Sequence, residues 1–137
     1  WKAGDVTGTP ETGFTAGLNN PPHVRVTYQG AVVNMTLVSD SFTADSAPDT
    51  GRIHVQVNPL DSITINTDLT AEVTRDGGTT WAEATLVAQE TLADGTVAYE
   101  DDSVDLSGQP SGTSMEYRIK TLNTKEIQVH GTILQWS

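Results

Sequence analysis

Hydrophobic residues recur at every second position along much of the chain, which is the period of a half-buried β-strand. The clearest case is residues 52–58, in which Ile53, Val55 and Val57 alternate with polar side chains. No stretch of helical length carries apolar side chains at the i, i+3, i+4, i+7 spacing of an amphipathic helix. The pattern therefore predicts an all-β protein.

The apolar runs are short, and turn signals rich in Gly, Pro, Asn and Asp separate them. Strands are predicted at residues 23–28, 31–38, 52–58, 63–65, 69–75, 80–87, 96–100, 104–106, 115–122 and 126–136. A polar loop is predicted over residues 40–51, and a break in the last strand at Gly131. This spacing favours an antiparallel β-sandwich, jelly-roll-like, in which eight or nine of these ten candidates are short strands.

Residues 1–22 are predicted to form an irregular N-terminal arm, because Gly and Pro interrupt them repeatedly. The arm has too little apolar surface to fold alone, so it is either mobile or laid across a neighbour. Residues 23–137 are predicted to form a single β-sandwich domain. Because the chain begins at Trp1 without a methionine, we expect it to be a fragment or a processed product.

The charge balance excludes several classes of partner. The 137 residues include 7 basic and 18 acidic side chains, and the formal net charge is −11. This balance argues against nucleic-acid binding and against an anionic membrane surface. No apolar run has the length of a membrane-spanning helix, so no membrane insertion is expected. The absence of cysteine excludes disulfides, a thiolate zinc site and a cysteine nucleophile.

The sharpest motif lies at residues 74–81 and is made by Thr74, Asp76, Gly78, Thr80 and Trp81. Its chemistry is that of a turn, since an aspartate can accept hydrogen bonds from following amides and glycine supplies positive φ angles. The string resembles the Asp-box of sialidases, which in those enzymes is a turn away from the active site. It occurs once here, and we interpret it as a structural turn.

Other candidate sites have weaker signals. Asp45, Asp49, Asp101 and Asp102 lie in two acidic segments where calcium could find oxygen ligands, although the spacing of a calcium loop is missing. We expect solvated segments there, with no metal and no cofactor. A glycosidase would need two carboxylates about 5–10 Å apart, and no motif marks such a pair. The chain is therefore predicted not to be an enzyme.

Aromatic side chains are candidates for a binding or assembly surface, because they offer a large contact area. The candidates are Trp1, Phe14, Tyr99 and Trp136. Trp81 and Tyr117 fall on apolar strand faces and are predicted to serve the core instead.

Several longer strings carry a resemblance to a known family. They lie at residues 34–39, 43–52, 68–81, 105–117 and 126–136. Together, over roughly residues 31–137, they resemble a module of uncharacterised tailed-bacteriophage proteins that are often described as tail, fibre or other virion structural proteins. The first thirty residues carry no such resemblance.

The resemblance implies a non-enzymatic virion structural protein: a fibre, tail or capsid-decorating module, located in the virion. Such a protein would act through self-assembly and contacts with other virion subunits. A homotrimer is expected, since fibres and spikes are commonly three-fold. The alternative is a host-receptor or glycan-binding module at a fibre tip, and a polysaccharide depolymerase is a third hypothesis.

Overall fold

The structure of the protein is a computed structural model, and it describes residues 32–137. The predicted arm over residues 1–22 and the predicted strand at 23–28 lie outside the described residues. The same holds for the candidate surface residues Trp1 and Phe14.

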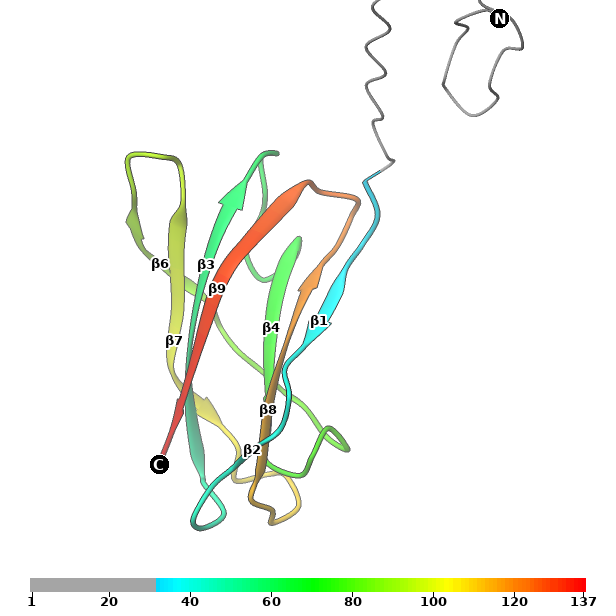
Figure 1. Ribbon diagram of the computed structural model, residues 1–137, viewed down its shortest axis with the longest axis vertical. Coiled ribbons are helices and arrows are strands. Elements are labelled where there is room, and N and C mark those ends of the chain that lie inside the picture. Colours follow the sequence, from blue (N-terminus) through cyan, green and yellow to red (C-terminus); the bar gives the residue numbers. More distant parts are fainter. Residues whose placement is uncertain (1–31) are drawn as a thin grey trace, which may run out of the picture. The chain divides into compact units, whose positions relative to one another are not determined.

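The described residues form nine strands and no helix (Figure 1). One sheet has the order β1-β8-β4-β5, with β2 also pairing β8, and the other has the order β6-β7-β3-β9. The strands are β1 (Thr36–Val38), β2 (Phe42–Thr43), β3 (Thr50–Pro59), β4 (Leu69–Thr74), β5 (Ala82–Glu83), β6 (Val87–Thr91), β7 (Val97–Asp105), β8 (Ser114–Thr121) and β9 (Ile127–Trp136). Every pair is antiparallel, so the predicted all-β sandwich is confirmed.

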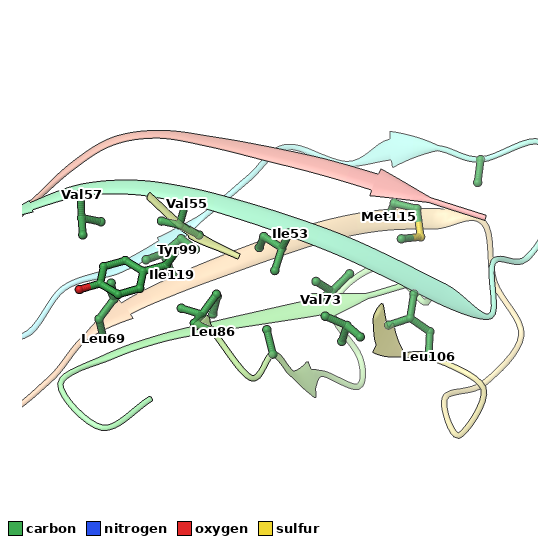
Figure 2. Close-up of a cluster of buried hydrophobic side chains, with 14 residues drawn as sticks. Ile53, Val55, Val57, Leu69, Val73, Leu86, Tyr99, Leu106, Met115 and Ile119 are labelled. Carbon is green, nitrogen blue, oxygen red and sulfur yellow. The ribbon is translucent and has the colours of Figure 1, made fainter. Parts of the chain in front are cut away.

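The core lies between the two sheets, as Figure 2 shows. The predicted alternation on β3 is confirmed, because Ile53, Val55 and Val57 are fully buried while their neighbours face outward. Opposing side chains come from β4 and β8, and the larger ones are Leu69, Val73, Met115 and Ile119. Burial of these side chains stabilises the fold by roughly 25 cal/mol for each Å² of apolar surface removed from water.

Several strand predictions differ from the structure because tertiary context decides short segments. Residues 80–87 are not one strand: β5 pairs β4, whereas β6 begins at Val87 and pairs β7 in the other sheet. Residues 96–100 and 104–106 belong to one strand, β7, because β3 supplies hydrogen-bonding partners through the acidic stretch between them. The predicted loop at 40–51 contains β2 and the start of β3.

The predicted strand at residues 63–65 does not form, because these residues are irregular and lead into a turn at residues 66–68. The Asp68 carboxylate accepts a hydrogen bond from the Thr64 amide at 2.7 Å, and Asn66 has a positive φ of 60°. Only an isolated bridge joins Ile65 to Leu69. The Asx-type hydrogen bond therefore competes successfully with a ladder.

The predicted break in the last strand corresponds to a β-bulge. Gln56 lies opposite Gly131 whereas Val57 lies opposite Val129, so His130 is the extra residue. A bulge of this kind shifts the alternation of side chains. It explains why Val129 and Leu134 both pack against the core although they would fall on opposite faces of a regular strand.

Candidate functional site

The Asp-box residues form one hydrogen-bonded turn after β4. The carboxylate of Asp76 accepts hydrogen bonds from the Thr74 hydroxyl at 2.6 Å, the Thr79 amide at 3.0 Å and the Thr80 amide at 2.9 Å. The Thr80 hydroxyl donates to the second carboxylate oxygen at 2.7 Å. The polar side chains of the motif are thus used inside the turn, which leaves the aspartate with a structural role.

Two glycines allow this turn to close. Gly77 and Gly78 have φ angles of 69° and 81°, which L side chains rarely adopt. A Cβ on Gly78 would also come within 3.3 Å of the Trp81 ring, whose Nε1 donates to the Gly78 carbonyl at 3.0 Å. Trp81 therefore packs against the base of the turn and not within the central core, where it was predicted to lie.

The guanidinium group of Arg118 packs over the Trp81 ring. The guanidinium carbon of Arg118 lies 4.4 Å from the ring centroid, a cation–π distance. Arg118 and Lys120 both pair with Glu72. Burial acts to raise the pKa of Glu72, but the hydrogen bonds from the two cations outweigh it and hold that pKa below its ordinary value.

Arg75, which lies between Thr74 and Asp76 of the motif, connects the loops at one end of the sandwich. It is only 5% exposed, and its guanidinium donates to the backbone carbonyls of Pro48, Ser107, Gln109 and Pro110. It also pairs with the exposed carboxylate of Asp49 at 2.7 Å. The residue thus fixes the β2–β3 and β7–β8 connections.

A tight approach at this anchor makes Gly112 sensitive to substitution. A Cβ there would overlap the Arg75 carbonyl oxygen and lie 3.1 Å from the Asp76 Cα, and both are backbone atoms that cannot move aside cheaply. Gly112→Ala is expected to lower the free energy of unfolding by about 1–3 kcal/mol. Urea denaturation measures this, with Gly108→Ala as the matched control because a Cβ there meets nothing within 4 Å. Equal losses in the two variants would contradict the close approach.

A polar cluster occupies the outer face of the β6-β7-β3-β9 sheet. Arg52 pairs with Glu100 and with Asp102, the latter at 3.1 Å, and His54 Nδ1 lies 3.3 Å from Glu100. Gln135 accepts a hydrogen bond from Arg52 at 3.3 Å. Two adjoining shallow depressions share Arg52 and Gln135 in their walls.

The pKa values of the two carboxyl groups of the cluster, Glu100 and Asp102, are shifted in opposite directions. A hydrogen bond from Asp102, together with the contact to Arg52, lowers the pKa of Glu100 to about 2. The same hydrogen bond and the charge of Glu100 raise the pKa of Asp102 above its ordinary value. Both carboxylates pair with the Arg52 guanidinium, which holds them on the same part of the sheet face.

Asp102→Asn is expected to stabilise the folded chain at pH 7 and to have no such effect at pH 3. A carboxyl whose pKa is raised on folding costs stability once the pH exceeds its folded pKa, and below its ordinary value of 3.8 the cost disappears. An amide at this position can still donate to Glu100. Thermal unfolding at pH 7 and pH 3 measures the difference between the variants. A lower Tm for Asp102→Asn at pH 7 would show that the contact with Arg52 dominates instead.

The four aspartates that were candidates for calcium do not share contact partners with one another. Asp45 is exposed, Asp49 pairs with Arg75, and Asp102 pairs with Arg52. Asp101 accepts a hydrogen bond from the Thr85 amide at 2.6 Å. Within residues 32–137, no three His, Asp or Glu side chains are grouped so that they could hold a metal ion.

The candidate aromatic residues fall into different environments. Tyr99 is 8% exposed within the core, where burial raises its pKa, so it has no surface to offer a partner. Its position inside follows from its pairing with Val55, an inward-facing residue of β3. Trp136 is partly buried, with its ring centroid 6.4 Å from that of Phe42. Tyr117 packs against the core, as predicted.

Sequence reasoning missed a run of exposed apolar side chains before and along β1. The alternation predicted that Val33, Met35 and Leu37 share one face of a strand, but that strand is short and all three are exposed. Val32, Val38 and Phe42 continue the run. We call these six residues the apolar strip. Alternation identifies an apolar face, but it does not say whether the same chain covers that face.

Comparisons of the chain with protein-family models, with curated proteins and with solved structures found no match. Among the residues that the structure describes, no helix is long and apolar enough to cross a membrane.

Proposed function

We propose that the chain is a non-enzymatic virion structural module of a tailed bacteriophage, acting through self-assembly and through contacts with other virion subunits. The strings at residues 34–39, 43–52, 68–81, 105–117 and 126–136 support the virion assignment by resemblance. The two-sheet sandwich is compatible with this role, although a fold does not fix a function.

The apolar strip is the observation that carries the proposal. Its side chains are exposed by between 36% and 71%, and they follow one another closely in the chain at one edge of a sheet. Several large apolar side chains left exposed along one edge segment favour a contact with another protein surface. A neighbouring virion subunit that buried the strip would remove this surface from water and cover the edge strand β1.

Light-scattering chromatography of the 137-residue chain, with and without calcium, tests self-assembly. A discrete oligomer is expected, and the three-fold state suggested by the resemblance is one specific outcome. A monomer at all concentrations would contradict self-assembly. An oligomer that forms only with calcium would instead assign a metal to the acidic segments.

A second candidate function is binding of a host-surface glycan at the polar cluster. Arg52, Asp102 and Gln135 line a shallow depression, and planar polar side chains of these types can hydrogen-bond sugar hydroxyls. Trp136 lines the same depression, and its ring is partly buried because it packs against the core and lies near Phe42. Glycan-array binding that is lost in Gln135→Ala would favour this function over assembly.

A further inference from the structure

β9 is the longest edge strand among the described residues, and it has neither a charged side chain nor a proline. It ends the order β6-β7-β3-β9 with ten residues, whereas β1, β5 and β6 at the other edges have three, two and five. An edge strand presents unpaired N–H and C=O groups to any second strand. Proteins usually blunt such edges with charges, prolines, short length or a β-bulge, and β9 has only the last of these, at His130.

β9 lacks the first two devices entirely. Its sequence, IQVHGTILQW, contains no Lys, Arg, Asp, Glu or Pro, in a chain with a net charge of −11. The opposite edge, β6, contains Glu90, and β5 contains Glu83. β9 is therefore a long uncharged strip along which two strongly acidic chains could approach with little local repulsion.

Two residues of β9 have features that the chain's own packing does not require. A Cβ on Gly131 would meet nothing within 4 Å, so neither crowding nor a positive φ demands glycine there. Glycine inside a strand often marks a bulge or the close approach of another backbone, and Gly131, which lies beside the His130 bulge, also leaves room for a second strand. Ile133, two positions on, is 57% exposed on the outer face of the same sheet.

We propose that β9 pairs antiparallel with β9 of a second copy about a two-fold axis, which would join the two four-stranded sheets into one continuous sheet. This inference rests on the proposed self-assembly and assigns it a two-fold contact, in place of the three-fold state that the resemblance implies. The occupant is a second copy because the same uncharged strand then lies on both sides of the contact, as a two-fold interface requires. The contact leaves the apolar strip free for other subunits.

Ile133→Lys in the full chain tests the pairing, with Val87→Lys as a closely matched control. Val87 is 56% exposed and lies on β6, at the other end of the row of cross-strand neighbours that contains Ile133. Along this row Val87 pairs with Glu100, Glu100 pairs with His54, and His54 pairs with Ile133. Both variants change the net charge equally and make the chain less acidic. Any dissociation confined to Ile133→Lys therefore arises at the β9 edge and not from overall repulsion.

We expect the dissociation constant of the dimer, measured by sedimentation equilibrium, to rise at least about tenfold in Ile133→Lys and to stay unchanged in Val87→Lys. Circular dichroism confirms that both variants fold. Self-association that persists in Ile133→Lys would overturn the β9 contact but leave the proposed assembly function standing. A chain that is monomeric without any substitution would overturn both.

A second measurement does not depend on weakening the contact. Because the chain has no cysteine, single cysteines at Gly131, Ile133, Gln135 and Val87 report specific proximities. Mild oxidation is expected to cross-link two copies efficiently through at least one β9 position and poorly through Val87. Equal yields at all four positions would overturn the proposal.

Discussion

Arg75→Met is expected to lower the free energy of unfolding by about 3–5 kcal/mol, a larger loss than the one expected for Gly112→Ala. Four backbone carbonyls from two connections lose their donor at once. Each acceptor left without a partner costs about 1–3 kcal/mol where water cannot replace the donor, and the loops can relax to recover part of this. Methionine keeps the apolar stem, so the loss reports the guanidinium. Urea denaturation at pH 7 measures it.

Arg52→Met provides the contrasting arginine. Its side chain is 49% exposed and pairs with carboxylates on the outer face of the sheet. Exposed ion pairs contribute little, so a change below about 1 kcal/mol is expected. Arg75→Lys should fall between the two variants, because an ammonium cannot reproduce the planar fork of donors. Similar losses of unfolding free energy in Arg75→Met and Arg52→Met would show that the hydrogen bonds from Arg75 to the carbonyls stabilise the fold no more than exposed ion pairs do.

Much of the fold was predictable because it depends on local alternation. Ile53, Val55 and Val57 gave the correct inner face of β3, and Gly131 marked the irregularity beside the His130 bulge. The failures lie where distant partners decide. Residues 80–87 divide between two sheets, and the acidic residues of β7 form a strand because β3 lies beside them. No pattern within either segment contains that information.

The candidate sites show the same division. The Asp-box turn was readable because the hydrogen bonds to the Asp76 carboxylate span at most four residues. The role of Arg75 within that motif was not readable, because its acceptors lie 26 to 35 residues away in the chain. The polar cluster likewise joins Arg52 to Glu100 across two strands of a sheet. Tyr99, which a sequence can only identify as an aromatic residue, is placed inside by its pairing with Val55.

Asp76→Ala is expected to lower the free energy of unfolding by about 2–4 kcal/mol, because two backbone amides and two hydroxyls lose their acceptor. The hairpin between β4 and β5 would lose its closing contacts, and Trp81 its fixed position. Tryptophan fluorescence during urea denaturation measures both effects. Asp45→Ala, at an exposed aspartate of the β2–β3 loop, is the control, with a change expected within about 0.5 kcal/mol.

The pH dependence of this loss of unfolding free energy distinguishes the contribution of the charged Asp76 carboxylate from that of side-chain packing. Burial acts to raise the pKa of Asp76, but the hydrogen bonds from Thr74, Thr80 and Thr79 outweigh it, so the pKa is lowered from its ordinary value of 3.8. A lowered pKa contributes stability that is complete above 3.8 and is lost as the pH falls through the folded value. The difference between the unsubstituted chain and Asp76→Ala should therefore shrink below about pH 4. A difference that stays constant from about pH 7 to about pH 2 would mean that packing, and not the charged acceptor, holds the turn.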